Sequence, residues 1–496
     1  MAKELVHSFE GELPEGWATA TIGDLISPEG VFIDGDWVES KDQDPNGDVR
    51  LIQLADIADG YYKDKSERFL TKEKALKLNC TFLKKGDVLI ARMPDPLGRA
   101  CIFPGDAKES VTVVDVCVVR TGTEVVNNKW LMYWVNSPRF RNTIASLQSG
   151  TTRKRISRGN LATITFPVPP SEQQKRIVAK IEELFSHIDA GIEALKKAKQ
   201  LLKQYRQSVL KAAVTGELTK EWREANKDKL EPASQLLERI LKERRQKWEE
   251  QQLEQFKAKG KMPKDDKWKE KYKERLEPEW PELGELPEGW AWITIDQLAS
   301  DKPRSIQSGP FGSNLKHSEF QETGKLVVGI DNVREGFFSM GSENRISEKK
   351  YAELEKYAAR PGDVLITVMA TIGRTCVIPE DLEPTIITKH VYRITVERDL
   401  VLPDYLNMCL YGAPSVVDQI FSQTIGQTRP GLNGAIIKDL CIPIPTTEEQ
   451  RLILNKVNEK SESIKRLEPE LDAQLFKAER NKQSVLASAF SGSLKG

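Results

Sequence analysis

The residues of this chain best suited to chemistry are a cluster that could hold phosphate. Between Ser149 and Arg158 the sequence places four cations beside two threonines and a glycine: Thr151, Thr152, Arg153, Lys154, Arg155 and Arg158. Positive charge, hydroxyl groups and glycine-loop amides are the groups that bind the phosphates of nucleic acids. The cluster recurs 276 positions later (427 minus 151) with less charge, as Gln427, Thr428 and Arg429 after a glycine. A solvated loop is the alternative, but the shared Gly-x-Thr-Arg core favours a phosphate site.

Other loops carry groups that could read base edges. Arg92 to Arg99 follows one short apolar run, and Val368 to Arg374 follows its repeat, but the two loops differ although their flanks match. Dissimilar loops on similar scaffolds are expected of two readers of different sequences, although drifted surface loops would look the same. The segment from Ser308 to Lys316 also lacks a clear counterpart in the first half. Our candidate contacts in these loops and in the repeated segment near 330 are Arg92, Arg99, Lys316, Asn332, Arg334 and Arg374.

Motifs for catalysis are missing. The sequence has no phosphate-binding Gly-x-x-x-x-Gly-Lys loop, no His-Glu-x-x-His and no Gly-x-Ser-x-Gly. The six cysteines form no Cys-x-x-Cys pair, and none has a histidine at zinc-ligand spacing. Asp265-Asp266-Lys267 resembles the tail of a nuclease motif but lacks an upstream acidic partner. We therefore predict no catalytic residues and no metal site.

The elements that carry these loops occur twice. Gly11 to Ala18 and Gly284 to Ala291 share eight consecutive identities around Leu-Pro-Glu-Gly-Trp. Gly-Asp-Val-Leu-Ile at 86–90 recurs at 362–366, where a turn enters an apolar run typical of a buried strand. The pattern predicts an α+β fold with two mixed, mostly β domains in pseudo-twofold tandem repeat, each with short helices near 130–134 and 405–410.

A long helix is predicted after each domain. Proline-rich segments end the domains, and Ser171 with Gln174, and Thr447 with Gln450, have the spacing of a capping box. Apolar residues then recur at intervals of three and four over some 45 residues, as in a coiled coil. We expect the two helices to pair antiparallel, with one domain at each end of the pair. Pro469 lies inside the second helix, where proline costs about 3 kcal/mol, so a bend or break is expected there.

These features divide the chain into five segments: a first domain at 1–166, a long helix at 167–218, a charged helical insert at 219–283, a second domain at 284–442 and a second long helix at 443–496. The insert is either a solvated linker or a docking segment whose Trp222, Trp248 and Trp268 contact a partner. The formal net charge is zero, so nucleic-acid contacts must come from local clusters. No apolar run approaches the length of a membrane span and no secretory signal opens the chain, so we expect a cytoplasmic protein without membrane contact.

The ordered, duplicated motifs make the whole chain similar to the specificity subunits of Type I restriction-modification systems. The resemblance is carried by the paired Leu-Pro-Glu-Gly-Trp and Gly-Asp-Val-Leu-Ile segments, by Pro-Val-Pro-Pro-Ser-Glu-Gln-Gln (167–174) with Pro-Ile-Pro-Thr-Thr-Glu-Glu-Gln (443–450), and by the endings Gln-Ser-Val-Leu and Gly-x-Leu.

The resemblance implies two target-recognition domains, each binding one half of a split double-stranded DNA site, with paired long helices setting the spacer between the halves. It implies a non-catalytic subunit that scaffolds two modification (methyltransferase) subunits and the restriction (translocase and endonuclease) subunits. S-adenosylmethionine, ATP and Mg would belong to those partners, with no cofactor on this chain. The alternative is a coiled-coil scaffold whose globular domains bind protein rather than DNA.

Overall fold

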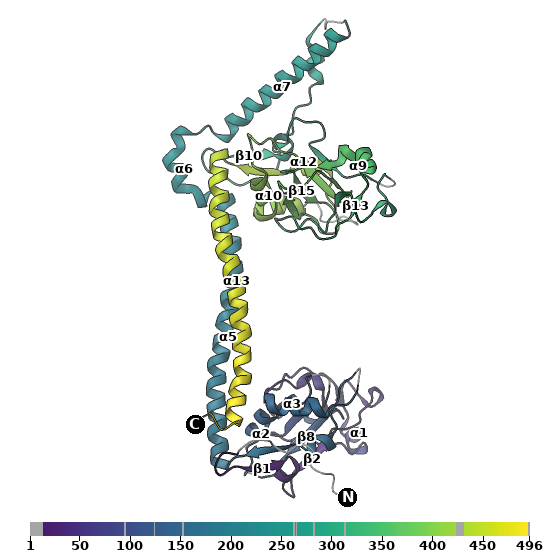
Figure 1. The fold of residues 1–496 in the computed structure, drawn as a ribbon, viewed down its shortest axis with the longest axis vertical. Coiled ribbons are helices and arrows are strands. Elements are labelled where there is room, and N and C mark those ends of the chain that lie inside the picture. Colours follow the sequence, from purple (N-terminus) through teal and green to yellow (C-terminus); the bar gives the residue numbers. More distant parts are fainter. Residues whose placement is uncertain are drawn as a thin grey trace. The chain divides into compact units, whose positions relative to one another are not determined.

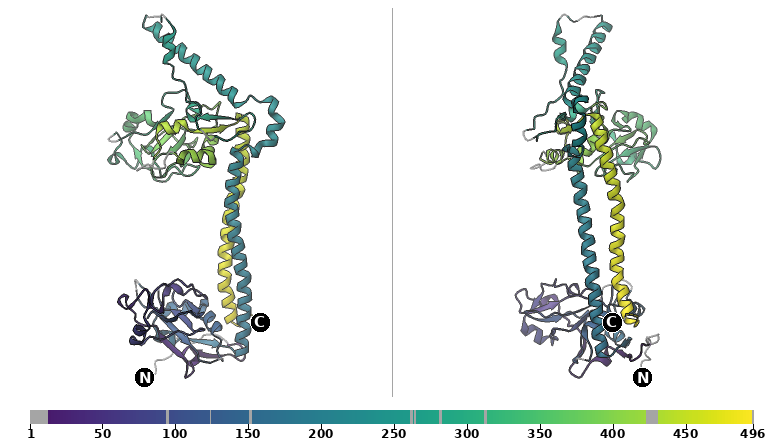
Figure 2. Two further views of the ribbon diagram at one scale, coloured as in Figure 1. Left: turned by 180° about the vertical axis from the view of Figure 1, so that it is seen from behind. Right: turned by 90° about the vertical axis from the view of Figure 1, so that its left-hand side faces the viewer.

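The fold was obtained as a computed structural model, which describes residues 13–93, 96–123, 125–150, 153–260, 263, 265–280, 283–311, 314–422 and 431–494. The chain forms two compact units (Figures 1 and 2). Unit 1 comprises Met1–Ala198 and Glu470–Gly496, and unit 2 comprises Lys199–Pro469. Each unit therefore contains one globular domain, the start of one long helix and the end of the other.

The domain of unit 1 is built from three small sheets. One is four-stranded and antiparallel in the order β2-β8-β5-β6, one is mixed in the order β4-β3-β7 with β3 and β7 parallel, and one pairs β1 with β9. The strands are β1 (Ala18–Thr21), β2 (Val31–Asp34), β3 (Val49–Ile52), β4 (Phe69–Leu70), β5 (Val88–Ala91), β6 (Ala100–Ile102), β7 (Glu109–Thr112), β8 (Val116–Arg120) and β9 (Thr165–Val168). Its helices are α1 (Lys72–Lys77), α2 (Asn128–Val135), α3 (Pro138–Leu147) and α4 (Arg158–Ala162).

The domain of unit 2 repeats this plan. Its sheets have the orders β11-β18-β15-β16, β13-β12-β17-β14 and β10-β19, with β12 and β17 parallel. The strands are β10 (Ala291–Thr294), β11 (Ile306–Ser308), β12 (Lys325–Val328), β13 (Arg345–Ile346), β14 (Ala358–Ala359), β15 (Val364–Thr367), β16 (Thr375–Val377), β17 (Thr385–Ile387), β18 (Val391–Ile394) and β19 (Cys441–Ile444). Its helices are α8 (Ile295–Leu298), α9 (Glu348–Leu354), α10 (Pro403–Gly412), α11 (Pro414–Ser422) and α12 (Gly434–Asp439). The predicted pair of mixed, mostly β domains is confirmed, as are the short helices near 130 and 405.

Each buried strand of the Gly-Asp-Val-Leu-Ile motif lies at the centre of its four-stranded sheet. All four residues of β5 and all four of β15 are buried. A strand covered on both faces must be apolar throughout, which explains why the motif reads as a continuous hydrophobic run rather than an alternating one. The preceding glycines, Gly86 and Gly362, have positive φ angles of 96° and 79°, a turn conformation that glycine adopts without a steric penalty.

Both long helices are present, as α5 (Ser171–Val214) and α13 (Thr447–Phe490). In unit 1, Lys482 of α13 forms an ion pair with Asp189 of α5, and in unit 2 Glu468 pairs with Arg206. A second contact in each unit gives the direction: Glu479 acts on Lys196 in unit 1, and Lys456 donates to the Leu218 carbonyl, just beyond α5, in unit 2. Higher numbers on one helix thus meet lower numbers on the other, so the two helices run antiparallel within each unit, as predicted.

The predicted capping boxes are wrong in detail. Gln174 is buried, and its side-chain amide donates to the carbonyls of Pro169 and Val125 while accepting from the Asn127 backbone N–H at 2.8 Å. Gln450 makes the same three bonds, to the carbonyls of Pro445 and Leu400 and from the Leu402 N–H at 2.8 Å. The glutamines thus reach into the globular domain, where backbone groups of a buried loop lack other partners. Thr446 rather than Thr447 caps α13, since its hydroxyl accepts from the Glu449 N–H.

The predicted break at Pro469 is also wrong, because α13 continues from Thr447 to Phe490 with this proline inside it. Pro469 lies on an exposed face. The carbonyl that loses its helical hydrogen bond can therefore bond to water. The helix lacks one backbone hydrogen bond at this point but continues.

The last turn of each long helix completes the core of one domain. In unit 1, Phe490 of α13 is buried edge-on against Trp134 of α2, with ring centroids 5.0 Å apart, and also touches Trp130. Gly492 follows in the left-handed conformation, and a Cβ there would lie 2.7 Å from Pro14. In unit 2, Gly216 follows α5 in the same conformation, and a Cβ at this position would lie 2.7 Å from Pro287. The paired Leu-Pro-Glu-Gly-Trp segments are thus the surfaces on which the helix ends pack.

The insert folds as part of unit 2 and is not a solvated linker. It comprises α6 (Lys220–Asn226), α7 (Ala233–Ala258) and a 3₁₀ helix, η6 (Asp266–Lys271). Arg244 of α7 is 4% exposed and donates to the carbonyls of Gln297 and Ala299. Trp268 is buried against Trp248 within the insert itself, at 6.0 Å between ring centroids. These two tryptophans therefore stabilise the insert rather than presenting a free docking surface.

We predict that Gln450→Ala destabilises unit 2 by about 1–3 kcal/mol, because the Leu402 N–H and two carbonyls would be buried without partners. Chemical denaturation followed by tryptophan fluorescence measures the loss, and hydrogen exchange at the Leu402 amide localises it. The matched control is Gln204→Ala on an exposed face of α5. Equal stability of the two variants would contradict the role assigned to Gln450.

Candidate nucleic-acid interface

The basic loop of unit 1 lies against the end of strand β5. The Ile156 N–H donates to the Arg92 carbonyl at 3.1 Å, and the Arg92 N–H donates to the Asp115 carbonyl at 2.9 Å. Ser149 and Arg155 close the loop by exchanging backbone hydrogen bonds of 2.9 Å. The structure therefore brings the loop after β5 and the basic loop together at one end of the four-stranded sheet, although they are some sixty residues apart in sequence.

Two carboxylates brace this basic surface. Asp34, at the end of β2, forms ion pairs with Arg92 at 3.2 Å and with Arg158 at 3.6 Å. Asp115 pairs with Arg155 at 2.8 Å. Burial, together with the nearby Asp34 carboxylate, raises the pKa of the Cys117 thiol, so this cysteine is a neutral part of the support. The carboxylates fix the arginines in place without neutralising the whole cluster.

The predicted contact residues of this region divide by exposure. Arg92 is only 8% exposed and donates to the Ile156 and Val114 carbonyls, so it supports the loops and does not present its guanidinium to a ligand. Arg153, Lys154, Arg155 and Arg158 are exposed. Of these, Arg153 and Lys154 have no ion pair within the described residues, which leaves their charge available to phosphate. Thr151 and Thr152 lie outside the described residues.

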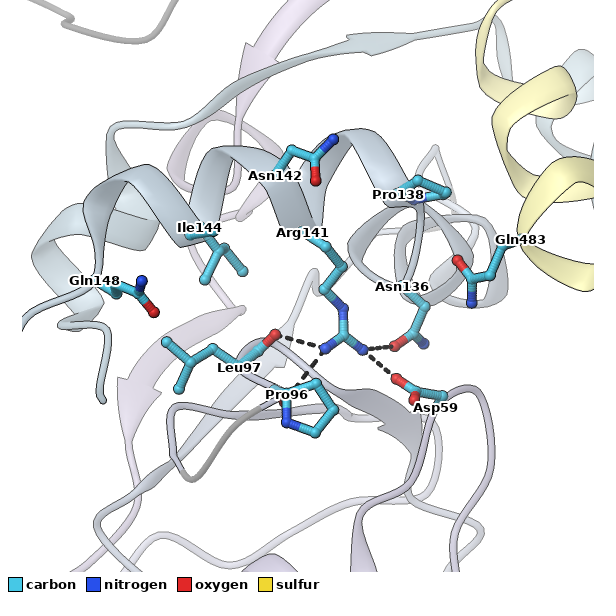
Figure 3. Close-up of a pocket in the computed structure, with 11 residues that line it drawn as sticks. Asp59, Pro96, Leu97, Asn136, Pro138, Arg141, Asn142, Ile144, Gln148 and Gln483 are labelled. Carbon is cyan, nitrogen blue, oxygen red and sulfur yellow. Dashed lines mark hydrogen bonds and ion pairs between the residues drawn. The ribbon is translucent and has the colours of Figure 1, made fainter. Parts of the chain in front are cut away.

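Arg99 and Arg141 hold the loop that follows β5. Arg99 donates to the Ile57 carbonyl at 3.2 Å and to the Pro96 carbonyl at 3.4 Å. Arg141 of α3 points from the other side into a pocket, where it bonds the Leu97 carbonyl at 2.5 Å, the Asn136 side chain and the Asp59 carboxylate (Figure 3). The predicted contact residue Arg99 is therefore half-buried and bonded to backbone, and its first role is to shape the loop.

The equivalent end of the sheet in unit 2 has the same backbone pairing but different side chains. The Leu432 N–H donates to the Val368 carbonyl, and the Val368 N–H donates to the His390 carbonyl. Val368 thus takes the position of Arg92, and His390 takes the position of Asp115. The carboxylate of Asp115 pairs with an arginine of the basic loop in unit 1. Partial burial and neighbouring Lys389 lower the pKa of His390, which favours its neutral form. In the loop, Met369 is exposed and Ala370 adopts a φ of 63°, a strained conformation for a residue with a Cβ.

The remaining predicted residues of unit 2 are scattered. Lys316 and Arg334 are exposed, and Arg374 is half-buried at the start of β16. Asn332 is 1% exposed, and its amide donates to the Ser339 and Met340 carbonyls, so it organises its own loop and is unavailable to a ligand. Gln427, Thr428 and Arg429 lie outside the described residues.

Sequence reasoning missed two exposed aromatic residues at equivalent turns. Tyr61 is 59% exposed and Phe337, 276 positions later, is 60% exposed. Each follows a glycine of positive φ, Gly60 or Gly336, whose N–H donates to the first residue of β6 or β16 at 2.9 Å. The repeat contained this signal, because Asp-Gly-Tyr-Tyr at 59–62 aligns with Glu-Gly-Phe-Phe at 335–338. Large exposed aromatics at matched positions mark a surface that both domains share.

Within the described ranges, histidine, cysteine, aspartate and glutamate side chains form no group that could hold a metal ion. In the same ranges, no helix has the length and apolar character needed to span a membrane.

Two copies of one α+β module, each followed by a long helix and each with different loops at the same sheet end, define a tandem recognition protein. The chain belongs to the family described as "Type I restriction modification DNA specificity domain", which matches residues 14–202 and 312–473.

The relatives of this chain include specificity subunits of Type I restriction enzymes. It is 23% identical over 380 residues to the EcoBI specificity subunit of Escherichia coli, covering 76% of this chain and 68% of that protein. It is 21% identical over 498 residues to the EcoKI specificity subunit of Escherichia coli strain K12, covering 98% and 90%.

Solved structures share the fold. The HsdS subunit from Thermoanaerobacter tengcongensis matches with a TM-score of 0.56 at 18% identity, covering 98% of this chain and 99% of that one. A chain from a structural study of the assembly and conformational transition of a type I R-M system matches with a TM-score of 0.65, also at 18% identity, covering 98% and 100%.

We predict that Arg153→Ala combined with Arg155→Ala weakens binding to duplex DNA of any sequence. Each lost phosphate contact lowers the slope of log affinity against log salt by about 0.9, so the double variant should lose up to about 1.8. Fluorescence anisotropy at several salt concentrations measures the slope. The control is Lys84→Ala with Lys85→Ala, two exposed lysines that precede β5 at its opposite end. An unchanged slope in the arginine variant would remove the basic loop from the interface.

Proposed function

We propose that this chain is the DNA-recognition subunit of a Type I restriction-modification complex and reads a bipartite target, one half-site per domain. The observation that carries the proposal is the pattern of identity and difference between the two modules. Sheet order, the glutamine bonds and the helix ends are repeated, whereas the side chains at one end of the four-stranded sheet are not. A protein that reads two unlike half-sites needs one frame and two different reading surfaces.

The first domain is expected to rely more on charge. Its basic loop offers four exposed cations, of which Arg155 and Arg158 are held by Asp115 and Asp34. Phosphate contacts of this kind position a protein on the duplex, and base edges are then read by neighbouring loops. We propose that the loop bonded by Arg141 and Arg99 does this in unit 1, and the loop containing Met369 and Ala370 in unit 2.

The repeated features suit a partner that is also present twice, which supports binding of two modification subunits. Tyr61 and Phe337 offer one matched surface. On the long helices of unit 2, Leu201, Tyr205 and Leu467 also remain between 41% and 54% exposed, although the predicted apolar stripe includes Tyr205 and Leu467. Apolar side chains left exposed along a helix are typical of an interface.

Catalysis is assigned to those partners. We propose that modification subunits bring S-adenosylmethionine for adenine methylation, and that restriction subunits bring ATP-driven translocation and Mg-dependent cleavage. This chain would supply target choice and assembly, acting on DNA in the cytoplasm.

Exchange of one recognition domain tests the proposal. Replacing residues 18–165 with the corresponding domain of a relative should change one half of the methylated motif and leave the other half as it was. Because Phe490 completes the core of unit 1, the donor domain should be tested with and without its own counterpart of residues 470–494. Mapping of methylated adenines in cells reads the result.

The reciprocal exchange of residues 291–441 is the matched control and should change the other half alone. Loss of both half-sites from a chimera that still assembles would contradict one half-site per domain. Failure of the assembled complex to bind any duplex would instead favour a scaffold whose domains bind protein.

A further inference from the structure

The outer part of the insert carries a concentrated positive charge that the proposed function does not yet use. Between Lys257 and Lys273 the sequence has eight lysines against three acidic residues, a net charge of +5 (8 minus 3). The whole chain has a net charge of zero, so the remainder is negative by the same amount. We call residues 257–273 the lysine tip. These seventeen residues thus carry an excess of positive charge that the rest of the chain does not share.

The tip is held on a folded support. Toward its start, α7 is anchored to the domain of unit 2 by Ile240 in the core and by Arg244, which also pairs with Glu397 at 3.3 Å. The returning chain is anchored by Arg275, which pairs with Asp296 at 3.4 Å, and by the Leu276 N–H on the same carboxylate. Between these anchors α7 extends away from the domain, as both views show (Figures 1 and 2). The described lysines of the tip therefore sit at the end of a fixed arm, and Lys261 and Lys264 lie outside the described residues.

Aromatic packing keeps the end of the arm folded. Trp268 stacks on Trp248 and meets Phe256 edge-on at 6.0 Å, and Tyr272 lies 5.3 Å from Trp248. Trp268 is 8% exposed. The aromatic side chains face one another, which leaves the polar side chains of the tip to face solvent.

Several acidic residues near the tip pair with cations, whereas Asp265 and Glu270 of the tip have no ion pair within the described residues. Glu249 pairs with Arg245 and with Lys269, Glu274 pairs with Arg245, and Asp266 pairs with Lys269. The exposed lysines that have no ion pair within the described residues are Lys257, Lys259, Lys267, Lys271 and Lys273. Like charges this close repel one another, so the arrangement is most stable beside a polyanion.

The kind of partner follows from the side-chain chemistry. Lysine is depleted at protein interfaces, which are centred on aromatic and apolar side chains. Here the aromatics are turned inward and the lysines outward. Flexible ammonium groups bind phosphate as point charges and do not discriminate bases.

We propose that the lysine tip binds the phosphate backbone of duplex DNA, without sequence preference, as a second contact beyond the recognition surfaces. The inference rests on the proposed function only in taking DNA as the ligand of this chain. It adds affinity and leaves the recognised target unchanged.

The test neutralises three exposed lysines that flank Trp268 and Tyr272 in the sequence. In the full-length chain, Lys267→Gln, Lys271→Gln and Lys273→Gln are combined, and affinity for a fluorescent duplex of arbitrary sequence is measured over a series of salt concentrations. The slope of log affinity against log salt should fall by up to about 2.7, three contacts at about 0.9 each, and affinity near 0.1 M salt should drop about tenfold or more.

Three controls accompany the variant. Replacing the same three lysines with arginine keeps the charge and should restore both slope and affinity. The tryptophan emission of the whole chain, to which Trp248 and Trp268 contribute among ten tryptophans, should be the same in all three proteins if the arm stays folded. Adenine methylation in cells should map to the same motif in the glutamine variant and in the wild type.

An unchanged salt slope in the glutamine variant would overturn the proposal. If the slope is unchanged and the glutamine variant also loses a co-purifying protein, the ligand of the tip is an acidic protein rather than DNA. Failure of the proposed function gives a different result: no methylated motif maps to the wild-type chain, whereas the slope difference between the lysine and glutamine proteins persists.

Discussion

The side-chain amide of a buried glutamine joins each globular domain to the long helix that follows it. Gln174 and Gln450 each satisfy three backbone groups of the domain from the first turn of a helix, in the same geometry. A buried amide with three partners fixes both the direction and the position of the helix, because moving the helix would leave all three groups without hydrogen bonds. The direction in which each domain presents its loops relative to its own helix depends on this junction.

The tryptophan of each opening segment supports the same junction. Trp17 donates to Gln173, and Trp290 donates to the buried carboxylate of Glu449 at 3.0 Å. Glu449 also accepts from Thr219 and pairs with Arg223 of the insert at 2.7 Å. The second junction is therefore tied to the insert, and the first is not. The insert is part of the frame of unit 2, which gives its outer arm a fixed base.

The two domains and the two long helices could be predicted from the sequence, because the duplication allows one copy to be compared with the other. Identity at Leu-Pro-Glu-Gly-Trp and Gly-Asp-Val-Leu-Ile marked the frame, and apolar spacing marked the helices. The roles of individual side chains in the folded domains could not be predicted in this way. A glutamine three residues after a serine satisfies the spacing of a cap whether or not its side chain turns back, and only the packed domain shows that it turns inward. Arg92 and Asn332 looked like contacts because polar loop residues usually face solvent, yet here they bond to carbonyls below the surface.

The two domains share one frame but have different reading surfaces, so the form of the DNA target is the most direct test of their roles. Methylated adenines should be mapped across the DNA of cells that make this chain with its modification subunits. We predict one motif with two short specified halves, different in sequence, separated by a constant number of unspecified bases. A single uninterrupted motif, or two halves that are copies of one another, would contradict the assignment of different half-sites to the two domains.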